Sequence, residues 1–351
     1  MLRLLLGFLF IGALLAGKAI AQTRTWTTSD GRRAQGELFE VVGDEIGLRI
    51  RGREYRFPIT RFSSEDQAYV REWLRSPRCE LCARPLGKNK TMKAGDKSYH
   101  AGCFRCLVCR NVFKPGESFR RDKWGMLVHV NHYAQAASCG SCSKIFARQG
   151  ARREQFLPDG RVVCLSCLGD GVYQDQALRE VDARVTGALR SVGIDKPEGK
   201  ITLELVDRSA LLKEGKRIRV TGENLKGLTL TKFRTTTKGS VSNTTFEHRI
   251  MVLYGLPYVE CQAVLAHEYL HVWLNERFVD ASPAEVEGFC NLGSHLLLQK
   301  ESGKLSSVLM QNMKESTSPI YGVGYRRMVQ LLARRGWPGL LADMAAKAKR
   351  K

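Results

Sequence analysis

The sequence lacks any long apolar run after residue 21. A membrane helix needs about 20 apolar residues in succession, so the sequence predicts no stable membrane insertion of the chain that follows. The first 21 residues differ, because Arg3 precedes an apolar stretch, Leu4 to Ala16, and Ala19-Ile20-Ala21 has the small-residue pattern of a cleavage site. We interpret residues 1–21 as a signal peptide. It predicts export to the periplasm or the extracellular space, with a retained membrane anchor as the alternative.

Acidic residues are also scarce. The 35 Asp and Glu are outnumbered by 56 Lys and Arg, which gives a formal net charge of +21. Such an excess suggests an anionic partner such as nucleic acid. The basic residues are spread along the chain, however, and they lack the interleaved aromatic side chains that bind single strands by stacking. We therefore expect protein or peptide partners, and nucleic acid is the minor alternative.

Histidine is rare, with seven residues in the sequence. Two of them, His267 and His271, form an H-E-x-x-H motif with Glu268. Residues four apart share one face of a helix, so these two imidazoles can bind one zinc ion. The glutamate between them can reach a zinc-activated water and act as general base. The flanks, 263–266 and 272–274, are uncharged, which predicts a buried helix. The plain alternative is a core helix whose polar side chains are satisfied without a metal.

A hydrolytic zinc site needs a third protein ligand and leaves a fourth position for water. Residues 283–298 form a second predicted helix, in which Glu287 is our first choice of ligand, followed by Glu285 and then His295. Glu285 and Glu287 are two residues apart and point in different directions on a helix, so both cannot bind the same ion. His295 lies two turns beyond Glu287 on about the same face, as a ligand, a neighbour of the site or a core histidine.

Nine of the eleven cysteines fall between residues 79 and 167, mostly in pairs separated by two residues. Such a pair can hold one tetrahedral ion, and the interleaved histidines favour zinc over disulfides. The two other cysteines, Cys261 and Cys290, are interpreted as buried apolar residues. The spacing predicts three closed, structural zinc sites, which are Cys79, Cys82, His100 and Cys103; Cys106, Cys109, His129 and His132; and Cys139, Cys142, Cys164 and Cys167.

Three segments resemble known modules. Residues 77–134 have the spacing of a LIM domain, apart from His129, where most LIM domains have cysteine. Residues 135–170 look like a third, LIM-like zinc module, and we expect treble-clef or zinc-ribbon hairpins in both. Residues 22–76 resemble the Sla-type homology domain of endocytic adaptors, through Trp26 and the segment 57–66, and predict a small β-barrel. LIM-type modules usually bind proteins, so a protein partner is expected.

The whole pattern resembles the plant DA-one-like LIM metallopeptidases, which regulate organ size. The resemblance rests on the LIM spacing, on G-L-P followed by A-H-E-Y-L-H-V-W-L, and on E-G-F-C-N at residues 287–291. It implies that residues 171–351 form a mainly helical, zincin-like domain of the gluzincin type, within a multidomain α+β chain. Because the family has E-G-x-C-Q, the resemblance also supports Glu287 as the third ligand.

The activity implied is that of a zinc-dependent endopeptidase with one catalytic and about three structural zinc ions. Glu268 would be the general base, and Tyr321, Tyr325 and His295 are candidates for stabilising the transition state. Two other interpretations stay open. One is a non-catalytic scaffold that binds proteins through its LIM modules. The other is a SprT-like, DNA-associated protease, in which His295 would be the third ligand.

Overall fold

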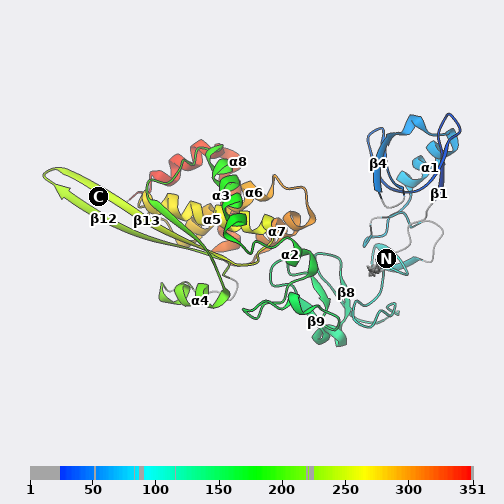
Figure 1. The fold of residues 1–351 in the computed structure, drawn as a ribbon, viewed down its shortest axis with the longest axis horizontal. Coiled ribbons are helices and arrows are strands. Elements are labelled where there is room, and N and C mark those ends of the chain that lie inside the picture. The colour runs from blue at the N-terminus through cyan, green and yellow to red at the C-terminus, as the bar shows by residue number, and fades with distance from the viewer. Residues whose placement is uncertain are drawn as a thin grey trace, which may run out of the picture. The chain divides into compact units, whose positions relative to one another are not determined.

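The computed structural model describes residues 24–50, 53–82, 84–86, 91–114, 116–218, 220 and 225–348. The chain divides into two compact units, which are described separately (Figure 1). The first comprises the residues up to Arg120 with Leu127–Val130, and the second comprises Arg121–Met126 and the chain from Asn131 onward. The predicted signal peptide lies outside the described residues. Among the described residues, no helix combines the length and the apolar character that crossing a membrane requires.

The first unit begins with an antiparallel sheet of four strands in the order β1-β2-β3-β4. Trp26, Ile46 and Leu48 are buried and pack with Phe62 and Val70 in one core. A helix, α1, covers this core and begins after Ser63, whose hydroxyl accepts a hydrogen bond from the N–H of the third helical residue. The elements are β1 (Arg24–Thr27), β2 (Arg33–Val42), β3 (Glu45–Ile50), β4 (Arg53–Pro58), η1 (Ile59–Arg61) and α1 (Ser64–Arg75).

The predicted closed barrel is wrong, because the sheet is open: its edge strands β1 and β4 do not pair with each other among the described residues. The end of β1 instead meets the segment that leads into α1. The Ser63 N–H donates to the Thr27 carbonyl at 2.8 Å, and the Asp66 carboxylate accepts the Thr27 N–H at 2.7 Å and pairs with Arg24 at 2.6 Å. The start of the helix thus satisfies the edge that a closing strand would otherwise have to cover.

Two short hairpins follow in the LIM-like region. Each of them ends its second strand at a histidine, His100 in the first and His129 in the second, so the strands position one ligand for each of the first two cysteine sets. Phe104 packs against Tyr99 and Phe113 between them. The hairpins are β5 (Thr91–Ala94) with β6 (Lys97–His100), and β7 (Phe119–Arg121) with β8 (Leu127–His129).

The second unit opens with a small module around the third cysteine set. Cys139 and Cys142 lie in the turn of the β9–β10 hairpin, while Cys164 precedes α2 and Cys167 lies within its first turn. A hairpin turn and a helix start therefore bring two pairs of sulfurs together. The elements are η2 (Val130–Gln135), β9 (Ala136–Ser138), β10 (Ile145–Ala147), η3 (Arg153–Gln155) and α2 (Leu165–Gly169).

The rest of the second unit is a three-stranded sheet covered by helices (Figure 1). The strand order is β11-β13-β12, with β11 parallel and β12 antiparallel to the central β13. Helix α5 packs on β12 and β13 and also contacts α3 and α6, while α6 packs on α8. The elements are α3 (Asp175–Arg190), β11 (Lys200–Val206), α4 (Arg208–Arg217), β12 (Gly227–Lys238), β13 (Val241–Leu253), α5 (Tyr258–Glu276), α6 (Pro283–Leu298), α7 (Lys304–Glu315) and α8 (Tyr321–Ala345).

The helices cross at glycines, and this brings the candidate ligands together. A Cβ atom on Gly288 would lie 2.5 Å from the backbone of Gly324, so α6 and α8 touch backbone to backbone. On the other side of α6, a Cβ atom on Gly293 would lie 2.6 Å from the Ala266 carbonyl oxygen of α5. Larger residues at these positions would separate the helices. The close crossing places Glu287 on α6 opposite His267 on α5.

Candidate metal centres and active site

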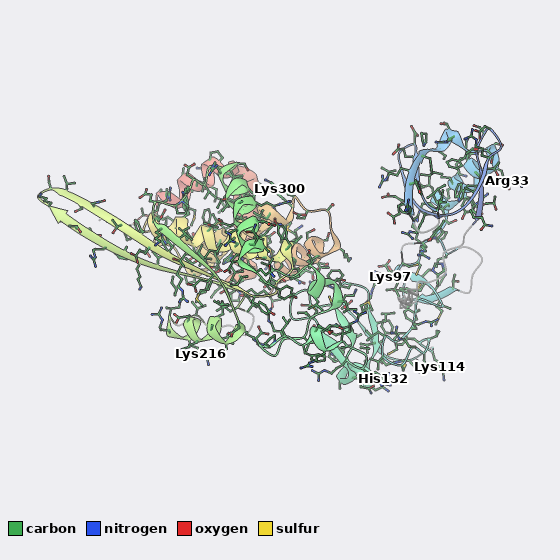
Figure 2. The ribbon with its side chains drawn as sticks, in the orientation of Figure 1. Arg33, Lys97, Lys114, His132, Lys216 and Lys300 are labelled. Carbon is green, nitrogen blue, oxygen red and sulfur yellow. The ribbon has the colours of Figure 1, made fainter. Side chains whose placement is uncertain are left out.

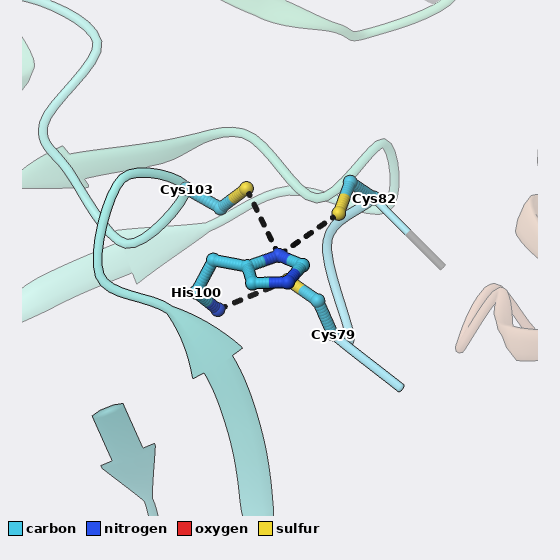
Figure 3. Close-up of side chains that lie close together, drawn as sticks. All are labelled: Cys79, Cys82, His100 and Cys103. Carbon is cyan, nitrogen blue, oxygen red and sulfur yellow. Dashed lines mark hydrogen bonds between the residues drawn. The ribbon is translucent and has the colours of Figure 1, made fainter. Parts of the chain in front are cut away.

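The first cysteine set surrounds a histidine ring (Figure 3). The Nδ1 atom of His100 lies 3.3 Å from the Cys82 sulfur and 3.9 Å from the Cys103 sulfur, close to the roughly 3.6 Å that separates N and S ligands of one tetrahedral zinc. Its Nε2–H donates to the Pro85 carbonyl at 2.9 Å. With Cys79, all four ligand atoms lie within 4.8 Å of one another. The residues therefore fit a structural zinc ion bound through His100 Nδ1.

The second set repeats this arrangement with a different outer contact. The Nδ1 atom of His129 lies 3.5 Å from the Cys109 sulfur, and its Nε2–H faces the Glu117 carboxylate at 3.1 Å. Such a carboxylate fixes the ring and makes the ligand nitrogen more basic. Cys106 and His132 complete a group within 4.8 Å. The departure from the common LIM pattern at His129 thus leaves a complete ligand set.

The third set consists of four buried thiols, Cys139, Cys142, Cys164 and Cys167, whose sulfurs also lie within 4.8 Å of one another. The Cys164 N–H donates to the Cys139 sulfur at 3.3 Å. Hydrogen bonds from the neighbouring thiols, from Cys142 above all, lower the pKa of Cys139. A cluster of buried sulfurs that favours a thiolate is suited to zinc. The three Cys/His clusters point to zinc binding.

Buried polar contacts join this third module to the start of α5. Lys226, just before β12, donates to the Ser141 carbonyl at 3.1 Å and pairs with the buried Glu260 of α5. Arg161 donates to the carbonyl of Tyr254, at the end of β13. Backbone hydrogen bonds, such as Tyr258 N–H to Asp170 O at 2.9 Å, add to these contacts. The module therefore packs as part of the same body as α5.

The structure brings together His267, His271 and Glu287. The Nε2 atoms of the two histidines are 3.1 Å apart, and the Glu287 carboxylate lies 3.2 Å from His267 Nε2 and 3.7 Å from His271 Nε2. Two imidazole ligands of one tetrahedral zinc have nitrogens about 3.3 Å apart. The donor set and its spacing therefore fit one zinc ion with three protein ligands.

Two residues at this site were not predicted from the sequence. Asn291, one turn after Glu287, presents its Oδ1 to His267 Nδ1 at 3.1 Å, which leaves Nε2 for a metal. Thr229 of β12 donates its hydroxyl to Glu268 Oε2 at 2.8 Å. Gly227 also lies against this carboxylate, so closely that any Cβ atom there would collide with it. Asn291 stood next to the predicted ligands in E-G-F-C-N, but nothing in the sequence pointed to Thr229.

Burial and charge set the pKa values at the site. Burial raises the pKa of Glu268 to about 7, although His267 and the Thr229 hydroxyl act in the opposite direction. Burial also lowers the pKa of His271 to about 4, with a smaller effect from His267. For His267 burial acts downward, but contacts with Glu287 and Glu268 outweigh it and raise the pKa. A base with a pKa near neutrality can both accept and return a proton.

The other candidates lie in different places. Glu285 accepts the Ser282 N–H in a capping box at the start of α6 and pairs with Lys347 at 2.8 Å, so it is engaged away from the histidines. His295 Nδ1 lies 2.7 Å from the Tyr325 hydroxyl, and neither belongs to the metal-binding group. Tyr321 is close enough to Glu287 and Glu268 for their charges to raise its pKa, after the larger effect of burial.

Cys290 is a further donor near the histidines. Its sulfur lies within 4.8 Å of ligand nitrogens of His267 and His271, but it is fully buried on α6. The Glu287 carboxylate lies 3.2 Å and 3.7 Å from the Nε2 atoms of the same two rings and is partly exposed. Glu287 and Cys290 are thus both near the two rings, and the choice of the carboxylate as third ligand stays a prediction, as does the interpretation of Cys290 as a buried apolar residue.

A separate cavity of about 1030 Å³ lies between α3, α5 and β11. Tyr269 and Trp273 line it, and they are about 200° around α5 from His267 and His271. The cavity therefore does not belong to the metal site.

Comparisons with known proteins identify two segments. A family model described as "LIM domain" matches residues 79–137, and one described as "Protein DA1" matches residues 210–307. Protein DA1-related 2 of Arabidopsis thaliana is 26% identical over 282 residues, 69% of this chain and 51% of that protein. Protein DA1 of the same plant is 23% identical over 312 residues, with 71% and 58% covered. LIM domain-containing protein HDR3 of Oryza sativa subsp. japonica is 24% identical over 260 residues, with 64% and 51% covered.

The chain thus contains a LIM domain and a DA1-like domain and is homologous to the plant DA1 proteins, which confirms this part of the resemblance seen in the sequence. It spans about half the length of the curated relatives it matches. No solved structure matches the chain.

Proposed function

We propose that the protein is a zinc-dependent endopeptidase whose zinc is held by His267, His271 and Glu287. The observation that carries the proposal is the convergence of these three side chains beside Glu268, a buried carboxylate that is not needed as a ligand. A zinc ion bound there would polarise a scissile carbonyl and lower the pKa of water. The homology to plant DA1 proteins supports the same conclusion, and the leader predicted at residues 1–21 would place the activity outside the cytosol.

Different residues of the chain have different roles in the proposed reaction. Glu268 takes the proton of the attacking water at a carboxylate oxygen and returns it to the leaving amine. Thr229 orients that carboxylate through its hydroxyl, and Asn291 orients the His267 ring. Among the predicted candidates, we assign the stabilisation of the developing charge to Tyr321, because Glu287 and Glu268 raise its pKa after the larger effect of burial. Among the described residues, no strand pairs with the outer edge of β12, which passes beside Glu268 and offers backbone groups to an extended substrate.

The LIM domain and the third zinc module act in recognition. LIM domains are protein-interaction modules, and closed four-ligand sites leave no position for water or substrate. We assign them the binding of partner or substrate proteins.

Exchange of the base tests the proposal. Glu268→Gln keeps the shape of the side chain but cannot accept a proton, so we expect bound zinc to be retained and digestion of an unfolded test protein such as casein to fall at least 100-fold. Glu198→Gln, an exposed change, is the matched control. Full digestion by Glu268→Gln with zinc retained would remove Glu268 from this role.

The other two interpretations differ in their zinc ligands. A scaffold without catalysis would bind three zinc ions through the closed sets and would need no fourth, exchangeable one. A SprT-like protease would use His295, which instead lies against Tyr325. Elemental analysis of the parent and of Glu287→Ala separates these interpretations. Loss of a single zinc ion in the variant favours the peptidase.

A further inference from the structure

The β12–β13 hairpin extends well beyond the helices of its unit as an isolated ribbon (Figure 1). Strand β11 pairs with β13 only from Glu247 to Leu253, and α5 ends at Glu276, near the base of the ribbon. An isolated two-stranded ribbon is only marginally stable in water. Hydroxyl pairs across the strands support it, with Thr235 to Thr244 and Thr237 to Ser242 both at 2.9 Å. Among the described residues, no further strand pairs with β12 or with the part of β13 before Glu247, so the backbone groups at the outer edges of the ribbon have no strand partner.

Alternation along β12 separates its two faces. Thr229 and Thr231 point toward α5, where they contact Glu268 and Asn275. The even-numbered residues therefore point to the opposite face. Three of these are basic, namely Lys232, Arg234 and Lys238.

These basic side chains are exposed, and within the described residues none of them has an ion-pair partner within 4.0 Å (Figure 2 shows the side chains along the ribbon). Glu247 lies opposite Lys232 on β13 and is the one acidic residue of the ribbon strands. At the base, Phe233 is 59% exposed beside Phe278. Among the described residues, no strand pairs with the outer edge of β12. This edge carries backbone hydrogen-bonding groups between a row of positive charge on one face and the exposed Phe233 on the other.

We propose that this ribbon binds an acidic, extended segment of a protein substrate, which adds to the free edge of β12 as an antiparallel strand. The proposal rests on the proposed peptidase function, because β12 continues from the ribbon to Gly227 and Thr229 beside Glu268. Antiparallel pairing is the more stable per residue. A strand added in this way alternates in step with β12, so every second side chain lies beside the basic row.

Spacing and direction follow from strand geometry. At about 3.3 Å per residue, the basic row lies roughly 10 to 30 Å along β12 from Thr229. Because β12 runs from the site toward the ribbon tip, an antiparallel substrate runs from the tip toward the site. Its acidic residues therefore fall about three to nine positions before the scissile bond.

A binding experiment without cleavage tests the ribbon. The probe is a fluorescent twelve-residue peptide of alternating Glu and Thr, and its isomer has six Glu followed by six Thr. Both are titrated into full-length Glu268→Gln by fluorescence anisotropy at 0.15 M salt. We expect the alternating peptide to bind at least tenfold more tightly. The triple reversal Lys232→Glu, Arg234→Glu, Lys238→Glu should lose that binding, while the exposed control Lys300→Glu, Lys304→Glu, Arg327→Glu should keep it.

Backbone methylation separates strand pairing from charge alone. Peptides N-methylated at every Thr or at every Glu keep the same charge, but only one of them keeps the N–H groups that face β12. We expect one isomer to bind at least tenfold more weakly than the other. Equal binding by both isomers, equal binding by the block peptide, or equal competition by single-stranded DNA of the same charge would overturn the proposal. Since no cleavage is measured, failure of the peptidase function would show separately in the casein assay.

Discussion

The two kinds of candidate metal centre in this protein differ in how their candidate ligands are brought together. In the three closed sets, most ligands come in pairs separated by two residues, and turns or strand ends position them. In the site at His267, two ligands lie on α5 and the third on α6, and glycine contacts between helices fix their distance. The closed sets hold local folds together, whereas the open site depends on a fold that already exists. Loss of a ligand should therefore unfold the module around a closed set, whereas at the open site it should release the metal and leave the fold intact.

The largest effect is expected in the third closed set. Cys164→Ala removes one of four buried ligands, and structural zinc contributes roughly 10 kcal/mol or more to folding such modules. We expect loss of that zinc and unfolding of residues 136–170, detected by elemental analysis and rapid limited proteolysis. Cys261→Ala is the control, because that buried cysteine belongs to no ligand set. A folded module with its zinc retained would contradict the distinction.

The open site should lose its metal without losing its fold. His271→Ala is expected to release one zinc, to abolish digestion of casein and to leave far-ultraviolet circular dichroism unchanged. Elemental analysis alongside the activity assay checks this outcome. Unfolding of the variant would show that this metal is structural as well.

Removal of the buried base should stabilise the protein once the exchangeable metal is gone. Glu268 has an unfolded pKa of about 4.5 and a folded pKa of about 7, so between these values the folded state keeps a proton that the unfolded state has lost. The free energy of unfolding therefore falls as the pH rises through this window.

Glu268→Gln has no proton to lose, so its free energy of unfolding should not fall in this pH window. The variant should be more stable than the parent by roughly 3 kcal/mol at pH 8, with little difference at pH 4.5. Denaturant unfolding of both proteins, stripped of the exchangeable metal, measures the difference. Identical pH dependence in the two proteins would argue against a raised pKa for Glu268.

Asn291 should matter less than a ligand. Asn291→Ala removes the acceptor that orients His267, and loss of such an outer contact typically lowers metal affinity 10- to 100-fold. Competition with a chelator measures this affinity. Asn275→Ala, at the far end of α5, is the matched control and should leave it unchanged.

The smallest effect is expected at Thr229. Thr229→Val keeps the side-chain volume but removes a hydrogen bond that lowers the pKa of Glu268. The acidic limb of the pH–rate profile should therefore move upward by less than about one unit. Thr235→Val, in the ribbon, should leave the profile in place. A shift toward lower pH would mean that the hydroxyl does not stabilise the carboxylate.

The sequence was most informative where the chemistry is local. Paired cysteines and H-E-x-x-H motifs predict ligands because their spacing alone brings the side chains together in turns and on one helix face. The barrel prediction failed because the edge of β1 is covered by contacts with Asp66, far away in the chain, and no strand closes the sheet among the described residues. Thr229 was missed for the same reason, since its contact with Glu268 exists only after β12 has packed on α5.

The sequence did not predict the β12–β13 ribbon either. Strand β13 begins at Val241, and β12 pairs with it over its whole length. Residues 231–245 are mostly threonine and charged residues, so no alternation of apolar and polar residues marks them as strands. Their pairing follows from the turn at Gly239 and from cross-strand hydroxyl contacts.

The ion pair of Lys226 with the buried Glu260 connects the first turn of α5 to the module of the four thiols, because Lys226 also donates to the Ser141 carbonyl. Without zinc on the four thiols, the contacts that hold the start of α5 would weaken, although His267 and His271 themselves would be unchanged. Removal of zinc from this module is thus expected to disturb the proposed peptidase site without any change in its own candidate ligands.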